Sequence, residues 1–194
     1  GKWGNVYKYI VDSHDFINRK YKKKNMFSAL TMDIFNYIHN PWTRVLKGKR
    51  ILIVSPFIES IKKKESIREK IYGVDLFPEC TFVYAKPPQT QGQIRCKDYN
   101  LELDPFLEKL NSLKDSFDIA LCSCGGYGNI VVNHIYEMGK SAIYVGGVLQ
   151  MYFGIYGMRW MRERKDIMNL FMNQYWTRPM ESERPEGYEK VEKS

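Results

Sequence analysis

Four short apolar runs, separated by segments of helical character, constrain the fold more than any other feature of this sequence. The runs lie within 47–57 (KGKRILIVSPF), 80–85 (CTFVYA), 117–123 (FDIALCS) and 141–147 (SAIYVGG). Amphipathic or glycine-opened segments at 58–73, 103–116 and 130–139 separate them. Strands separated by single helices are joined by crossovers, so the sheet is parallel and covered on both faces. The sequence therefore predicts an α/β fold, a Rossmann-like, doubly wound, mainly parallel sheet.

Further helical segments flank this alternating region. Residues 5–20 and 27–39 have apolar residues at mixed three and four spacing, which predicts extra N-terminal helices, and a charged helix is expected near 161–173. We expect one domain over residues 1–180. Residues 181–194 have many charges and few apolar residues, which predicts a polar tail or linker. Because the sequence begins with Gly rather than Met, we expect it to be part of a longer chain with neighbouring domains.

Charge and cysteine content narrow the partners and the compartment. The net charge is +8, with lysine runs in 19–25 and 62–64, but no nucleic-acid recognition motif accompanies them, so we expect solvated helix faces and no nucleic-acid partner. No run of about 18 apolar residues occurs, so no membrane span is expected. Cys122 and Cys124 form a C-x-C rather than the C-x-x-C of a zinc or redox site. Reduced thiols in the cytoplasm are the expected state.

The carboxyl ends of the predicted strands are where a ligand is expected, because open α/β sheets bind ligands there. The segments at these ends are 55–57 (SPF), 85–90 (AKPPQT), 123–129 (SCGGYGN) and 146–150 (GGVLQ). In 123–129, three glycines stand between a strand and a helix, which lets backbone N–H groups approach a phosphate. A plain tight strand–helix turn remains the alternative, because the spacing matches neither G-x-G-x-x-G nor a P-loop.

Isolated charged residues near these ends give weaker signals. Lys86, beside two prolines, is a candidate partner of a diphosphate, and an exposed loop lysine is the alternative. Glu59 and Asp98 are the candidate catalytic or cation-binding carboxylates. For Glu59, a role opposite the helix dipole is the alternative.

The segment 146–160 (GGVLQMYFGIYGMRW) interleaves glycines, rings and a side-chain amide, which suits one wall of a sugar site. The alternative is that Tyr152, Phe153 and Trp160 fill the core behind the sheet. Gln150 separates these interpretations, because a buried amide needs a ligand or a backbone partner.

Residues 117–160 also carry a resemblance through spaced motifs: CGGYG (124–128), MGK (138–140), GG (146–147), FG (153–154) and RW (159–160). Together with YW (175–176), RP (178–179) and VE (191–192), these motifs are similar to those of a bacterial and viral family of polysaccharide-building proteins related to the GT-D glycosyltransferases. The match spans roughly residues 42–192. Within that family, the segment resembles the middle domain of multi-domain glycosyltransferase–methyltransferases of chlorella viruses, which implies the host cytoplasm as location.

The resemblance implies binding of a nucleoside diphosphate sugar, with UDP as the expected carrier, and transfer of a sugar, for instance a deoxyhexose such as rhamnose, to a glycan acceptor. GT-D enzymes carry an acidic "GRFGDGE"-like motif that helps hold a metal, whereas this chain has GKWGNVY at 1–7, with Asn5 and Tyr7 at the acidic positions. The resemblance thus supports nucleotide-sugar binding more strongly than dependence on a divalent metal. The residues expected to bind the nucleotide sugar are Ser55, Phe57, Lys86, Ser123, Cys124, Gly125, Gly126, Tyr127, Gly128, Gly146, Gly147, Gln150 and Arg159.

Two other functions remain open on the sequence. A non-catalytic domain of the same fold could bind a nucleotide or scaffold a neighbouring enzyme domain, and the missing acidic residues favour it. A Rossmann methyltransferase would also carry a glycine turn, but usually after the first strand, where this chain reads SPFIES (55–60).

Overall fold

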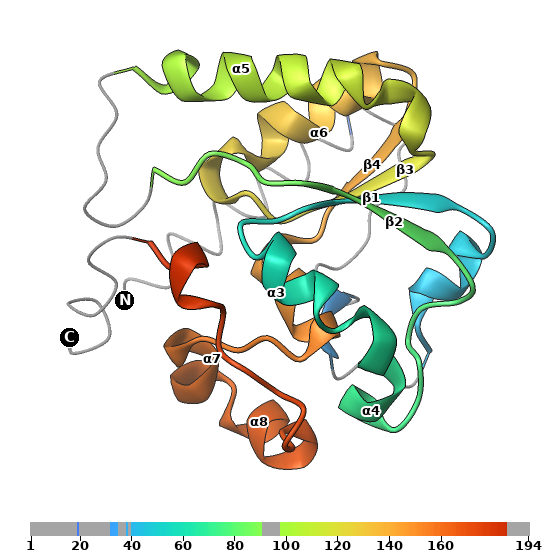
Figure 1. Ribbon diagram of the computed structural model, residues 1–194, viewed down its shortest axis with the longest axis vertical. Coiled ribbons are helices and arrows are strands. Elements are labelled where there is room, and N and C mark those ends of the chain that lie inside the picture. Colours follow the sequence, from blue (N-terminus) through green and yellow to red (C-terminus); the bar gives the residue numbers. More distant parts are fainter. Residues whose placement is uncertain (1–18, 20–31, 35–37, 39, 91–97, 186–194) are drawn as a thin grey trace. The chain divides into compact units, whose positions relative to one another are not determined.

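The structure is a computed structural model that describes residues 19, 32–34, 38, 40–90 and 98–185 (Figure 1). The chain divides into residues 1–31 and 32–194, and all elements named below belong to the second unit. The predicted N-terminal helices therefore lie almost entirely outside the described residues.

A four-stranded parallel sheet forms the centre of the unit. Its strands are β1 (Arg50–Val54), β2 (Thr81–Ala85), β3 (Ile119–Cys122) and β4 (Ser141–Tyr144), in the order β2-β1-β3-β4. Every pairing is parallel, and Ile51 of β1 pairs with Phe82 on one side and Ile119 on the other. The predicted α/β, Rossmann-like parallel fold is confirmed.

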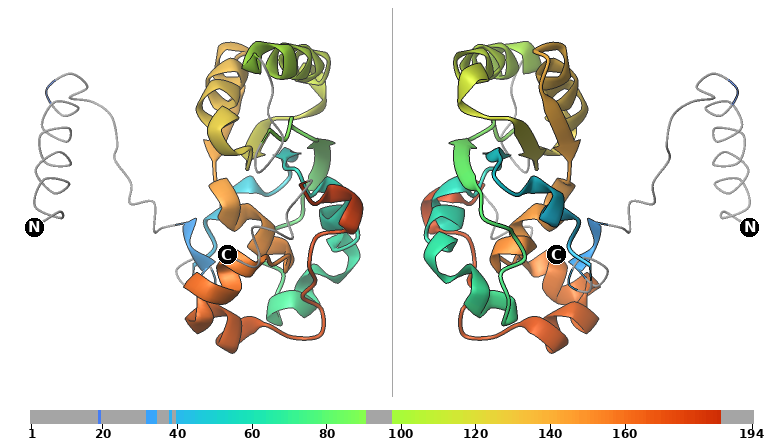
Figure 2. Two further views of the ribbon diagram at one scale, coloured as in Figure 1. Left: turned by 90° about the vertical axis from the view of Figure 1, so that its left-hand side faces the viewer. Right: turned by 90° about the vertical axis from the view of Figure 1, so that its right-hand side faces the viewer.

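Helices cover both faces of this sheet. In Figure 1, α5 (Tyr99–Ser112) and α6 (Gly128–Glu137) lie above it, and α3 (Ile58–Lys62), α4 (Arg68–Tyr72), α7 (Met158–Glu163) and α8 (Lys165–Phe171) lie below it. The side views in Figure 2 show the same order of layers. Short 3-10 turns connect these elements: η2 (Trp42–Leu46), η3 (Glu65–Ile67), η4 (Lys114–Ser116), η5 (Gly125–Tyr127), η6 (Gly146–Phe153) and η7 (Glu181–Glu183). Among the described residues, no helix is long and apolar enough to span a lipid bilayer.

The apolar runs supply both hydrophobic layers, because successive residues of a strand point to opposite faces. Ile51 and Ile53 belong to the cluster that packs on α3, α4, η6 and α8. Leu52 and Val54 belong to the cluster that packs on α5 and α6. Burial on both faces explains why β1 reads as a continuous apolar run rather than an alternating one.

The helix expected over 58–73 is broken into α3, η3 and α4. The break falls at Lys64, the last of three consecutive lysines, which turns inward and is buried. Its Nζ donates to the carbonyl of Tyr175 at 2.5 Å, and burial lowers the pKa of its ammonium group. Lys64 thus ties this region to the C-terminal segment instead of joining a solvated lysine face.

The helix expected over 103–116 starts earlier than its sequence signals indicate. The carboxylate of Asp98 accepts a hydrogen bond from the amide of Asn100, so α5 begins at Tyr99 and contains Pro105 in its interior. Asp98 is the N-cap residue of α5.

Packed structure continues past residue 180, where the polar tail was expected to begin. The turn η7 buries the side chain of Glu183 to 2% exposure. The carboxylate contacts the start of α3, which holds residues 181–185 against the domain.

Candidate functional site

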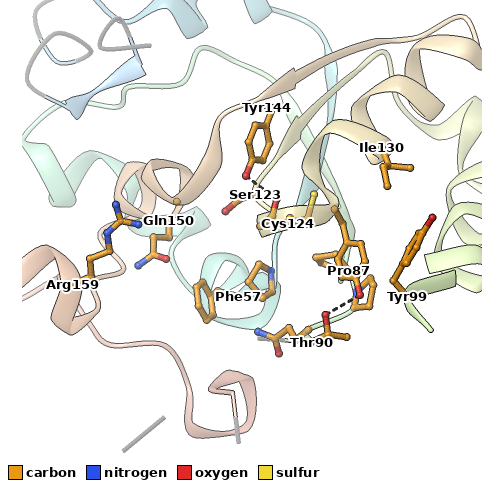
Figure 3. Close-up of a pocket in the computed structure, with 17 residues that line it drawn as sticks. Phe57, Pro87, Thr90, Tyr99, Ser123, Cys124, Ile130, Tyr144, Gln150 and Arg159 are labelled. Carbon is orange, nitrogen blue, oxygen red and sulfur yellow. Dashed lines mark hydrogen bonds between the residues drawn. The ribbon is translucent and has the colours of Figure 1, made fainter. Parts of the chain in front are cut away.

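The strand order creates a crevice at one edge of the sheet. From β1 the chain runs outward to β2 and then returns past β1 to β3, so the connections after β1 and β3 diverge at their carboxyl ends. Ligands of open α/β sheets bind at such switch points. A pocket of about 750 Å³ lies there, formed by the turns after β1, β2 and β3, the end of β4, η6 and α7 (Figure 3). Its size falls in the range of small-molecule sites, roughly 300–1,000 Å³.

Nine of the residues expected to bind a nucleotide sugar line this pocket. They are Phe57, Ser123, Cys124, Gly125, Gly126, Tyr127, Gly147, Gln150 and Arg159. Of the other expected residues, Ser55, Lys86, Gly128, Gly146, Glu59 and Asp98 do not line it. The pocket thus brings together residues that are separated by about half the chain.

The glycine turn presents backbone to the pocket. Gly125 has φ +54°, a left-handed conformation that favours glycine, and a Cβ on Gly126 would meet nothing within 4 Å. The hydrogen bonds of this turn begin with the amide of Tyr127, which donates to the carbonyl of Cys124 at 3.2 Å. The amides of Gly125 and Gly126 therefore precede the first bonded donor of the turn, as the leading N–H groups of a helix do.

Gly128 has a different reason to be glycine. A Cβ there would lie 2.3 Å from the ring of Tyr144, which packs across the start of α6. The Tyr144 hydroxyl donates to the carbonyl of Gly125 at 2.9 Å. Gly128 therefore makes room for a ring that holds the turn in place, and it contributes to the pocket indirectly.

The thiols of Cys122 and Cys124, of which Cys124 lines the pocket, are neutral at physiological pH. Burial raises the pKa of the Cys124 thiol to about 12, and burial together with Cys124 raises that of Cys122 further. Both side chains therefore stay protonated. They add no negative charge against an anionic ligand, and neither is suited to act as a thiolate nucleophile.

At the turn after β1, a carboxylate of the protein itself accepts hydrogen bonds from the first amides of α3. Glu183 accepts hydrogen bonds from the amides of Glu59 at 2.7 Å and Ser60 at 3.1 Å, and from the Ser60 hydroxyl. Ser55 is fully buried, and its hydroxyl accepts a hydrogen bond from the amide of Phe57 at 3.2 Å. Ser55 thus shapes the turn, and Phe57 is the residue of this turn that was expected and does line the pocket.

The two candidate catalytic carboxylates lie outside the pocket lining. The side chain of Glu59 is exposed and pairs with Lys62 at 2.8 Å, and Asp98 caps α5. Lys86 is exposed on the loop after β2. Within the described ranges, no group of three or more His, Cys, Asp or Glu side chains could hold a metal ion. Asn5 and Tyr7, at the aligned acidic positions, lie outside those ranges.

The segment 146–160 divides between the pocket and the core. Tyr152 and Phe153 are buried in the apolar cluster below the sheet, as the alternative interpretation holds for them. Gln150 and Arg159 line the pocket. The Gln150 Nε2 atom donates to the carbonyl of Ile155 at 3.1 Å, which is the backbone partner that a buried amide requires. Arg159 is exposed, pairs with Glu163 at 2.9 Å and lies over the ring of Trp160.

Sequence reasoning did not name eight of the lining residues, and five of these, Pro56, Pro87, Pro88, Gln89 and Thr90, lie within the strand-end segments expected at the ligand. The other three, Tyr99, Ile130 and Tyr144, lie outside those segments. Each is large and apolar yet 40–53% exposed. Tyr144 ends β4 and Ile130 lies in the first turn of α6, so their positions next to the expected strand ends were the available signal. Tyr99 could not be assigned, because the sequence places the start of its helix several residues later.

The loop after β2 closes the pocket between these elements. The hydroxyl groups of Thr90 and Tyr127 share a hydrogen bond of 2.8 Å, which joins this loop to the glycine turn. The side chain of Gln89 donates to the carbonyl of Glu183 at 3.4 Å. The loop is thereby held to both neighbouring turns.

Comparison of the chain with protein-family models, with curated proteins and with solved structures yields no match. The resemblance of residues 42–192 to the GT-D family therefore stays a prediction. The candidate site is defined by the geometry of this chain, namely a pocket at the switch point of a parallel sheet, where a glycine turn, exposed rings and one arginine meet.

Proposed function

We propose that this domain binds a nucleoside diphosphate sugar in the switch-point pocket and acts as a glycosyltransferase on a glycan acceptor. The observation that carries the proposal is the glycine turn between β3 and α6. It faces a pocket of nucleotide size that also holds Arg159. The resemblance adds UDP as the carrier and a deoxyhexose such as rhamnose as the sugar.

Phosphate binding follows from the chemistry of the turn. The leading amides at Gly125 and Gly126 and the positive end of the α6 dipole favour an anion. Among the described residues that line the pocket, Arg159 is the one with a positively charged side chain. Its guanidinium group can donate hydrogen bonds to two oxygens at once. The same groups would stabilise the diphosphate as its bond to the sugar breaks, when negative charge accumulates on it.

A specific observation favours a second candidate, a nucleotide-binding domain without catalysis. None of the lining residues that the structure describes is an aspartate, glutamate or histidine, so none is an evident base for the acceptor hydroxyl. Such a domain would bind the donor and deliver it to, or organise, a neighbouring enzyme domain.

Binding is tested first by thermal unfolding of the chain with UDP, other nucleoside diphosphates, their sugars and S-adenosylmethionine. A ligand that binds the folded state stabilises it by RT ln(1 + [L]/Kd), about 2.7 kcal/mol at one hundred times Kd. We expect stabilisation by a nucleoside diphosphate and none by S-adenosylmethionine. Stabilisation by S-adenosylmethionine alone would refute the proposal.

Catalysis and metal dependence are tested second. Hydrolysis or transfer of the tightest-binding donor, measured with and without excess EDTA, distinguishes the two candidates. Turnover that survives EDTA supports a transferase using Arg159 and backbone amides. Loss that manganese restores would place a cation on acidic residues, and tight binding without turnover under any condition would favour the non-catalytic domain.

A further inference from the structure

The two ends of the pocket differ in chemistry. Figure 3 shows Arg159 and Gln150 at one end and Tyr99 and Ile130 at the other, with Cys124 between them. The Arg159 end offers a guanidinium group and an amide. The Tyr99 end offers a ring and a branched aliphatic side chain, and Pro87 lies on the same side in this view.

The Tyr99 end exposes apolar surface that globular proteins normally bury. Tyr99 is 53% and Ile130 43% exposed, although both line a concave surface. Large apolar groups that face one pocket mark a ligand-binding surface more often than scattered exposed residues do. The group that covers this end must therefore be largely apolar.

The parts of a nucleotide sugar differ in what they require. A nucleobase has two apolar faces, and its stacking on an aromatic side chain contributes about 1–3 kcal/mol. A sugar presents hydroxyl groups that need donors and acceptors, which aliphatic side chains and prolines do not supply. The diphosphate requires N–H donors or cations, which the glycine turn and Arg159 provide.

We propose that the nucleobase lies against Tyr99 and Ile130, that the diphosphate crosses the glycine turn, and that the sugar points toward Gln150 and Arg159. This orientation rests on the proposed function. It makes Tyr99 and Ile130 the residues that recognise the nucleoside, and it directs the transferable sugar to the η6–α7 side, where an acceptor must approach.

The experiment compares ligands that contain and lack a base. UDP, GDP, ADP and dTDP are titrated calorimetrically into the full chain, and the tightest is carried forward with its monophosphate and with inorganic pyrophosphate. Tyr99→Ala should weaken both nucleotides by about tenfold, ~1.4 kcal/mol, and leave pyrophosphate unchanged. Ile130→Ser should weaken the same two ligands, by about threefold. Arg159→Gln should weaken pyrophosphate and the diphosphate together.

Tyr136→Ala is the matched control, because Tyr136 lies on α6, is 73% exposed and does not line the pocket. It should leave all three affinities unchanged. Tyr99 is an exposed residue in the first turn of α5, so its replacement should preserve the circular dichroism and the unfolding temperature.

The outcomes distinguish a wrong orientation of the nucleotide sugar from a failure of the proposed nucleotide-binding function. If the wild-type chain binds nucleotides and Tyr99→Ala binds them equally well, or loses pyrophosphate to the same extent, the orientation is overturned and the proposed function stands. If the wild-type chain binds none of the nucleotides, the proposed function fails and the orientation fails with it.

Discussion

Two neighbouring strands of this sheet, β1 and β3, are each followed by a turn that begins a helix. The two turns differ in what accepts hydrogen bonds from their first backbone amides. After β1, the first amides of α3 are bonded to Glu183, a buried carboxylate supplied from the far end of the chain. After β3, the amides of Gly125 and Gly126 precede the bonded part of the turn, and both glycines line the pocket. Both turns follow central strands whose last three residues are buried, and both begin helices.

The turn after β1 therefore has an anion supplied by the chain, Glu183. The turn after β3 has no such internal anion, and an anionic ligand is expected there. Glu183 and the Ser60 hydroxyl complete the α3 end, so that end serves stability and shapes the wall that carries Phe57. The glycine turn lacks side chains that could do the same. A diphosphate is therefore expected at β3 rather than at β1, which also argues against a ligand held after the first strand.

Removing the internal anion should have the largest effect on stability. Glu183→Ala removes the acceptor of the Glu59 and Ser60 amides and of the Ser60 hydroxyl, which should lower the free energy of unfolding by about 3 kcal/mol. Urea unfolding followed by circular dichroism measures this. Glu183→Gln retains one acceptor and should fall between the alanine variant and the wild type. An unfolding curve identical to that of the wild type would show that the carboxylate does not complete this turn.

The glycine turn should show the opposite pattern. A Cβ at Gly126 meets no atom within 4 Å, so Gly126→Val should keep the wild-type unfolding curve. Its side chain would cover backbone of the turn that lines the pocket, and the affinity for a nucleoside diphosphate should fall at least a hundredfold, ~2.7 kcal/mol. Unchanged affinity in the folded variant would remove the diphosphate from this turn.

This contrast also defines what the sequence could and could not predict. The parallel sheet, its covered faces and the glycine turn were predictable, because apolar runs, helical spacing and clustered glycines are local signals. Eight of the expected pocket residues followed from the rule that strand carboxyl ends meet at one edge, and the ninth, Arg159, was a candidate through the resemblance.

The role of Glu183 was not predictable, because its partners lie more than 120 residues away and its local composition reads as a polar tail. Glu59 and Asp98 were selected for their carboxylates, but one pairs with a neighbouring lysine and the other caps a helix. A carboxylate that forms a local ion pair or caps a helix has the same sequence pattern as a carboxylate that acts in catalysis. Tyr144 has a partner, Gly128, that only the fold brings beneath its ring.

Replacing Gln150 tests whether the pocket at the glycine turn also binds the sugar of a nucleotide sugar. In Gln150→Leu, the amide that lines the pocket and the hydrogen bond to Ile155 are both lost. We expect the affinity for the nucleotide sugar to fall about tenfold, ~1.4 kcal/mol, with a smaller change for the nucleoside diphosphate. Calorimetry with both ligands measures the ratio. An equal loss for the two ligands would assign Gln150 to the support of η6 rather than to the sugar.

The opposite edge of β1 and β3 should give the smallest effect. There Arg50 and Asp118 pair at 2.7 Å in solvent, and the hydrogen bonds from Arg50 lower the pKa of Asp118 to about 2 from an ordinary value of 3.8. A carboxyl group whose pKa is lower in the folded state stabilises that state above its unfolded pKa. This contribution is lost as the pH falls from about 3.8 toward 2. Asp118→Asn should therefore be slightly less stable than the wild type at pH 7, and the difference should shrink across that acidic range. Urea unfolding at pH 7, 4, 3 and 2 measures it, with wild-type nucleotide affinity expected at pH 7. A loss of nucleotide affinity in this variant would show that a charge at the amino ends of β1 and β3 affects ligand binding at their carboxyl ends. The two strand–helix turns would then depend on the rest of the sheet.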